Sequence, residues 1–135
     1  MRKIYLILFV IAVTVTNINA QPYKIGHTTI NFIDASRSNR NIATEVYYPA
    51  DVSGDNVALT TLNSLKFPSL VFGHGFVMTW DAYQNFWEAL GPNGFIIAFP
   101  KSEGSFSPYH LEFGKDLTFV INQMNVLGVT NQFYF

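Results

Sequence analysis

Apolar and β-branched positions alternate loosely with polar ones in two early segments, residues 23–32 and residues 42–48. Such alternation is typical of half-buried strands. The polar run at residues 34–41 separates the two segments, which predicts an antiparallel hairpin. Pro49 is expected to end the second strand, and residues 51–66 to form a surface connection.

Two later segments, residues 69–72 and residues 95–99, are almost uninterrupted apolar runs. Pro68 precedes the first run and Pro100 follows the second. Short apolar runs between turn signals are typical of strands covered on both faces, as in a parallel sheet. The sequence therefore predicts two inner strands.

Helical spacing of apolar residues follows each of these strands. Asp81 is the expected N-cap of the first helix, with Gln84 at capping-box spacing, and residues 91–94 (GPNG) should end it. Strand, helix and strand form a βαβ unit, which predicts a parallel pair with a right-handed crossover. Its apolar face comprises Tyr83, Phe86, Trp87 and Leu90.

The second helix is expected to start at Ser107 and Pro108, a cap and first-turn pair, and to end near Asn125 before a polar turn at residues 128–132. Its predicted buried face consists of Phe113, Leu117, Val120, Ile121 and Met124.

These elements predict an α/β fold: an antiparallel hairpin, a parallel βαβ unit and a further helix. This set of elements lacks a strand, because inner parallel strands need neighbours on both sides and no strand follows the second helix. A four-stranded sheet ending in a parallel strand would leave a row of unpaired backbone groups at its edge. We therefore interpret residues 21–135 as the N-terminal portion of a larger α/β domain.

The first twenty residues have the pattern of a secretory signal peptide. Arg2 and Lys3 precede the apolar residues 4–15, a polar stretch follows, and cleavage is expected after Ala20. Ile18 fits the usual small-residue cleavage pattern poorly, so an uncleaved anchor is the alternative. The apolar run is shorter than the roughly 20 residues of a membrane span.

Composition narrows the function further. The 135 residues include no cysteine, and an exported protein without disulfides indicates a bacterial periplasm or the medium. Removal of the leader would leave six basic and nine acidic residues, a formal charge of −3. The basic residues are scattered, which argues against nucleic acid as a partner. No two of His27, His74 and His110 have a metal-ligand spacing, so we expect no metal and no cofactor.

The candidate site is the turn after the first inner strand, formed by Gly73, His74, Gly75 and Phe76. The two glycines are expected to adopt backbone angles that other residues avoid and to allow close approach of a ligand. Open α/β sheets bind ligands at the carboxyl ends of their strands. Unpaired amides at such a turn can stabilise a developing oxyanion.

Together, these segments resemble the N-terminal half of α/β-hydrolases of the dienelactone hydrolase, platelet-activating-factor acetylhydrolase and polyester-hydrolase (cutinase-like) group. The resemblance covers roughly residues 22–127 and rests on the hairpin with its DASR turn and EVYYPA, then on VFGHGF, LGPNGF and DLTFV, in that order. The combination is fairly specific, although each piece alone would be weak.

The resemblance implies a secreted serine ester hydrolase that works through an acyl-enzyme on a small-molecule, lipid or polymer ester. The Phe76 N–H would form half of the oxyanion hole, and the side chains of Phe76 and Val77 would line the substrate pocket. Gly73, His74 and Gly75 would shape the turn, with His74 in a structural role. The family's nucleophile lies on a Gly-x-Ser-x-Gly elbow, followed by an acid and a histidine. No such elbow occurs here, so we expect this chain alone to be inactive.

Other candidates have plainer interpretations. His27 is expected to be a half-buried strand residue, His110 solvated, and Asp116 a buried anchor for a neighbouring loop. Ser105 lacks the second glycine of an elbow, and Trp80 is expected to pack or to flank the pocket.

Two further functions stay open: a complete, non-catalytic exported binding module with an aromatic crevice, and a non-hydrolytic relative of the haloperoxidase-like or acyl-transferring kind.

Overall fold

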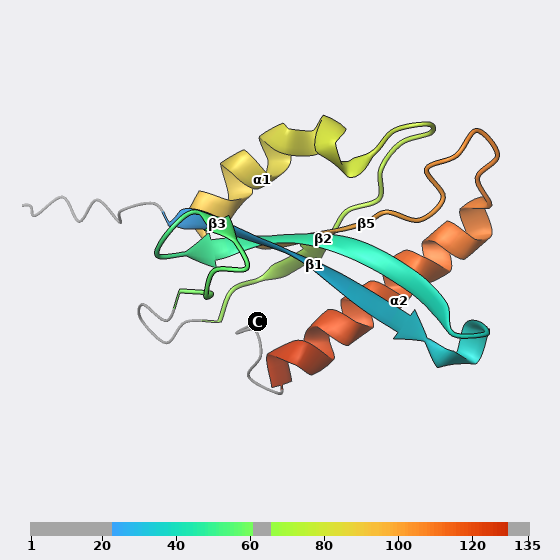
Figure 1. Cartoon of the computed structure of the whole chain (residues 1–135), viewed down its shortest axis with the longest axis horizontal. Coiled ribbons are helices and arrows are strands. Elements are labelled where there is room, and N and C mark those ends of the chain that lie inside the picture. The colour runs from blue at the N-terminus through green and yellow to red at the C-terminus, as the bar shows by residue number, and fades with distance from the viewer. Residues whose placement is uncertain (1–22, 61–65, 130–135) are drawn as a thin grey trace, which may run out of the picture.

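The computed structural model describes residues 23–60 and 66–129, so the predicted signal peptide lies outside the described residues. The strands form one mixed sheet in the order β3-β1-β2-β5-β4 (Figure 1). In chain order they are β1 (Lys24–Asp34), β2 (Arg40–Ala50), β3 (Gly54–Asp55), β4 (Ser69–Val71) and β5 (Ile96–Pro100). The α/β fold class is therefore confirmed.

The predicted hairpin is confirmed and is longer than expected. β1 and β2 pair antiparallel from Lys24 opposite Ala50 to Asp34 opposite Arg40. The connection is a short 3-10 helix, η1 (Ala35–Arg37). Pro49 does not end the strand, because its carbonyl accepts a hydrogen bond from the Thr60 amide at 3.0 Å and extends the pairing beyond it.

β4 and β5 run parallel, with Leu70 opposite Ile97, as the βαβ prediction requires. Between them lie η3 (Trp80–Tyr83), α1 (Gln84–Leu90) and η4 (Gly91–Asn93). The prediction of Asp81 as the N-cap is wrong. Asp81 lies inside η3, where its carboxylate accepts a hydrogen bond from the Thr79 hydroxyl, and α1 continues from η3 without a side-chain cap.

The expectation of two inner strands is confirmed for β5, while β4 has a neighbour on one side only within the described residues. All five residues of β5 are buried between β2 and β4. β4 is the last strand of the sheet within the described residues, and Leu70 is 41% exposed. An apolar run thus indicated a strand correctly, but its burial depends on neighbours that the run does not encode.

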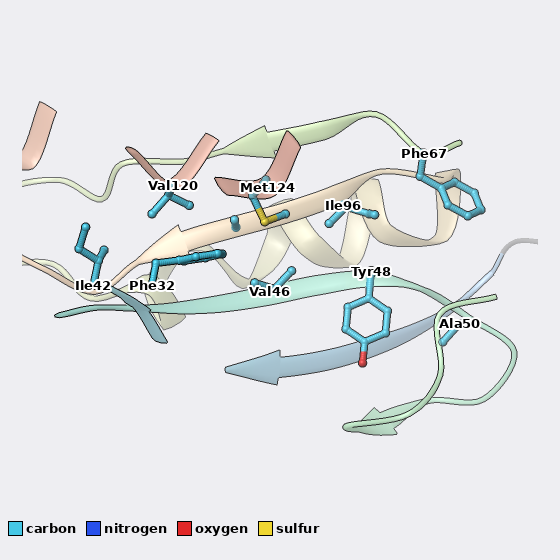
Figure 2. Packing of buried hydrophobic residues seen from close by; sticks show 10 residues of the cluster. Phe32, Ile42, Val46, Tyr48, Ala50, Phe67, Ile96, Val120 and Met124 are labelled. Carbon is cyan, nitrogen blue, oxygen red and sulfur yellow. The ribbon is translucent and has the colours of Figure 1, made fainter. Parts of the chain in front are cut away.

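The two helices cover opposite faces of the sheet (Figure 1). α2 (His110–Val129) lays Val120 and Met124 on Val46 and Ile96 of the central strands, and Figure 2 shows this packing. On the other face Trp87 of α1 stacks on Tyr47, with ring centroids 4.3 Å apart.

Both predicted ends of the second helix need correction. α2 starts at His110, not at Ser107, because the Tyr109 amide donates to the Glu103 carboxylate at 2.7 Å, so the capping group comes from the preceding loop. It also continues past Asn125 to Val129, with Gly128 buried, so the expected polar turn begins too early. In the described ranges, no helix combines the length and apolar character needed to cross a bilayer.

Candidate functional site

The turn after β4 has a defined backbone geometry. The Phe72 amide makes the last bond to β5, at 2.9 Å from the Ala98 carbonyl. Three residues after Phe72, the Gly75 carbonyl accepts a hydrogen bond from the Met78 amide at 3.1 Å, which closes a β-turn with Phe76 and Val77 at its centre. Val77 has φ +55° and Phe76 a negative φ, the pattern of a type II turn.

The Phe76 amide is a free donor in this turn. A β-turn closes through the amide of its fourth residue, so the amide of the second residue has no partner within the turn. No hydrogen bond joins the Phe76 amide to any acceptor in residues 23–60 or 66–129. Its neighbour differs, because the Gly75 amide donates to the Tyr83 hydroxyl at 2.7 Å.

Val77 is held in a conformation that a β-branched residue rarely adopts. The left-handed region costs an L-residue about 1–2 kcal/mol. Strain of this kind clusters at sites where the surrounding structure fixes the backbone for a function. No sequence signal marked Val77 as strained, because the flanking glycines were expected to take the unusual angles.

Those glycines serve a different purpose. Neither Gly73 nor Gly75 has a positive φ, so the expected backbone role is wrong. They are needed for space: a Cβ at Gly73 would lie 3.1 Å from Leu117 Cδ1, and one at Gly75 would lie 3.0 Å from the Tyr83 hydroxyl oxygen. Glycine lets the turn pack closely against α2 and η3.

His74 joins this turn to the loop after β5. Its Nε2 lies 2.8 Å from the Ser102 carbonyl oxygen and its Nδ1 lies 3.0 Å from the Gly75 carbonyl oxygen. The ring also packs on Phe113, with centroids 4.7 Å apart. Because both nitrogens face backbone carbonyls, this position does not suit a general base.

A small pocket of about 90 Å³ lies between the two loops. Trp80 lines it and also packs beside His27, with the two rings 18° from parallel, so the expected packing role is confirmed. The other lining residues are His74, Met78, Thr79, Lys101 and Gly104.

Next to this pocket, Glu45 collects three donors although its side chain is only 5% exposed. It binds His27 Nε2 at 2.8 Å, the Thr29 hydroxyl at 2.7 Å and the Lys101 ammonium. Burial acts to raise the pKa of Glu45, but these hydrogen bonds outweigh it and hold the pKa below its ordinary value. His27 Nδ1 also contacts Asp55 at 2.8 Å, so His27 is a structural strand residue.

Asp116 is the buried anchor that the sequence indicated. It is fully buried, and its carboxylate accepts hydrogen bonds from Arg40: Nε lies 2.9 Å from Oδ1 and Nη2 lies 2.7 Å from Oδ2. Arg37 Nη1 lies 2.7 Å from the same carboxylate. Burial opposes ionisation, yet the hydrogen bonds, led by those from Arg40, lower the pKa of Asp116.

The remaining polar candidates show no catalytic arrangement. Ser105 lies on an exposed loop, where its hydroxyl accepts a hydrogen bond from the Ser107 amide at 3.3 Å, and His110 is exposed at the start of α2. Over residues 23–60 and 66–129, no group of three or more His, Cys, Asp or Glu could hold a metal ion.

No family model and no curated protein matches this chain. Among solved structures it is similar to a ferulic acid esterase from Streptomyces cinnamoneus, with a TM-score of 0.50 and 18% identity. The match covers 61% of this chain and 34% of the esterase. At this identity the likeness shows a shared fold. The chain therefore shares an α/β fold with that esterase and spans about a third of its length.

Proposed function

We propose that this chain supplies the oxyanion-binding turn of a secreted serine ester hydrolase, with the Phe76 amide as one donor. The observation that carries the proposal is that amide: unpaired among the described residues, in a fixed turn at the carboxyl end of a parallel strand. The esterase with a similar fold supports the reaction class.

The chemistry follows from the geometry. When a nucleophile attacks an ester carbonyl, negative charge develops on the carbonyl oxygen, and pre-positioned N–H donors stabilise it. The Phe76 amide is such a donor, held by the bond between Met78 and Gly75 and by the Gly75–Tyr83 bond. The exposed side chains of Phe76 and Val77 would contact the substrate beside it.

The nucleophile, acid and base would come from residues beyond this sequence, as part of one larger α/β domain. The unpaired edge of β4 is where the sheet of that larger domain would continue. The Pro68 carbonyl and the Phe72 amide bond to β5, so the backbone groups of Ser69 and Val71 point outward. A groove of about 390 Å³ runs along this edge against Leu117 and Ile121 of α2. We propose that a further strand pairs here.

The first test is the reading frame downstream of codon 135. A Gly-x-Ser-x-Gly motif within a few tens of codons is required, because the chain needs the serine elbow beside β4. If no such motif follows, the hydrolase proposal fails.

The second test is Phe76→Pro in the longer product. Proline is favoured at the second position of a type II turn, so the substitution removes the N–H with little change to the turn. Loss of one oxyanion donor should lower kcat for a p-nitrophenyl ester about 100- to 1000-fold. Phe76→Ala, which keeps the N–H, is the matched control for the lost ring. Equal activity of the two variants would refute the assignment.

Export is a proposal from the sequence alone. Residues 1–20 lie outside the described residues, and their charged start and apolar run support a cleaved leader. Cell fractionation with N-terminal sequencing tests it, since processing should expose Gln21. A chain that keeps Met1 and stays in the cytoplasm would exclude export.

No specific observation favours the alternative of an aromatic binding crevice. The rings of Tyr47, Trp87 and Phe99 pack against one another in the layer between the sheet and α1. They act as core in the described part of the chain.

A further inference from the structure

We propose that Arg40 is a positioning residue for the candidate oxyanion turn, acting through Glu103 and Ser102 on His74. This inference rests on the function proposed for the turn. Arg40 is the first residue of β2. Its hydrogen bonds go to Asp116 and Glu103 and not to the turn itself. Its effect passes through the loop after β5.

The first step is the guanidinium of Arg40. Its Nε and Nη2 bind the buried Asp116 carboxylate of α2, and Nη2 also lies 2.9 Å from Glu103 Oε1. Arg40 therefore fixes Glu103, in the loop, relative to the helix. Hydrogen bonds to Glu103 from the Tyr109 amide and from Arg40 hold the pKa of this carboxyl below its ordinary value, so it is ionised at neutral pH.

The second step is the backbone of Glu103. Its φ is +63°, in the left-handed region that non-glycine residues rarely occupy. Such a conformation persists where the surroundings hold it. Here both carboxylate oxygens are held, Oε1 by Arg40 and Oε2 by the Tyr109 amide at 2.7 Å.

The third step is the peptide plane between Ser102 and Glu103. This plane carries the Ser102 carbonyl, and the φ angle of Glu103 sets its orientation relative to the anchored Glu103 side chain. The carbonyl points at His74 Nε2, 2.8 Å away. His74 directly precedes Gly75, the first residue of the β-turn. A chain of contacts thus leads from Arg40 to the segment that orients the Phe76 amide.

Arg37 provides the internal control. Its Nη1 also lies 2.7 Å from Asp116 Oδ1. Its other partners are Asp34, directly before η1, and Glu112 in α2. No ion pair joins Arg37 to the described residues of the loop after β5. Loss of Arg37 removes one contact to Asp116 and leaves the cation of Glu103 in place, whereas loss of Arg40 removes three contacts to Asp116 together with that cation. Glu103→Gln, which leaves both arginines on Asp116, separates the two effects.

The experiment uses the full chain, ¹⁵N-labelled, and two readouts by NMR: the ¹⁵N shifts of the His74 ring and hydrogen exchange of the Gly75 amide. The variants are Arg40→Gln, Glu103→Gln and the control Arg37→Gln. In Arg40→Gln and Glu103→Gln we expect the His74 Nε2 shift to lose its hydrogen-bonded character. The Gly75 amide should exchange about tenfold faster, the factor for one lost charge-assisted hydrogen bond.

Arg37→Gln should leave both readouts as in the wild type. If Arg40→Gln does not fold, Glu103→Gln decides, because it leaves the Asp116 pair intact. An unchanged His74 in Glu103→Gln, or an equal change in Arg37→Gln, would overturn the positioning role. Neither readout needs catalysis, so a failure of the hydrolase proposal in the Phe76→Pro test is separate from this one.

Discussion

The amide of Gly75 donates to the hydroxyl of Tyr83 at 2.7 Å, which ties the turn after β4 to the 3-10 segment that leads into α1. Tyr83→Phe removes this acceptor and should lower the free energy of unfolding by about 1 kcal/mol. Urea denaturation measures the change. Tyr109→Phe, at a 60% exposed ring, should stay within about 0.5 kcal/mol of the wild type. Equal effects of the two substitutions would show that the Tyr83 bond is not stabilising.

A substitution at Val77 is expected to stabilise the protein instead. Asparagine tolerates the left-handed region better than a β-branched residue, so Val77→Asn should raise the free energy of unfolding by about 1 kcal/mol. Val52→Asn is the control, because Val52 is also exposed and has no positive φ. A gain at Val52 as large as that at Val77 would mean that relief of strain is not the cause.

Gly73 and Gly114 differ in the space around them. A Cβ at Gly73 would press on Leu117 Cδ1 at 3.1 Å and Phe113 Cε1 at 3.3 Å. Gly73→Ala should therefore destabilise the protein by about 1–3 kcal/mol, the cost of overpacking. Gly114 in α2 has no atom within 4 Å of a Cβ, so Gly114→Ala should stabilise the helix by about 0.5–1 kcal/mol. Thermal unfolding of both variants checks the contrast, and a stabilised Gly73→Ala would contradict it.

Ionised Asp116 should account for part of the loss in the free energy of unfolding at low pH. Its pKa in the folded chain is lowered, so its stabilising contribution is complete above the ordinary carboxyl pKa near 4 and is lost as pH falls through the lower, folded value. Asp116→Asn leaves two arginines without their buried charge and should cost about 3–5 kcal/mol.

Urea midpoints measured between pH 3 and pH 7 test both statements about Asp116. The wild-type midpoint should fall below about pH 4, and that fall should be shallower in Asp116→Asn. Glu88→Gln, at an exposed carboxylate of α1, is the control and should follow the wild-type curve. A variant curve parallel to the wild type over the whole range would exclude Asp116 as a source of the pH dependence.

The sequence predicted what local patterns determine. Alternation placed the hairpin, and the two apolar runs placed β4 and β5 as a parallel pair. It also predicted that the sheet would end in a parallel strand with an open edge, and β4 is that strand within the described residues. The two-residue strand β3 was missed because its pairing with His27 is a tertiary contact without a pattern of its own.

The sequence predicted a turn after the first apolar run, and the structure has a β-turn there, closed between Gly75 and Met78. It did not predict the backbone of that turn, because Val77 and not the glycines takes the left-handed angle. The role of the turn as a site stays a prediction. The start of α2 depends on Glu103, six residues before the amide that it caps. Such contacts join segments whose spacing in the sequence is arbitrary, so composition and periodicity carry no signal for them.

The hydrogen bond between His74 and the Ser102 carbonyl joins the turn after β4 to the loop after β5. Under the proposed function, a substrate that contacts the loop after β5 would hold the Ser102 carbonyl in place and so stiffen the turn that carries the Phe76 amide. By reciprocity, a group that accepts the Phe76 hydrogen bond would strengthen binding at the loop by the same free energy. Binding at the loop and hydrogen bonding at the Phe76 amide would then be coupled through the imidazole ring of His74.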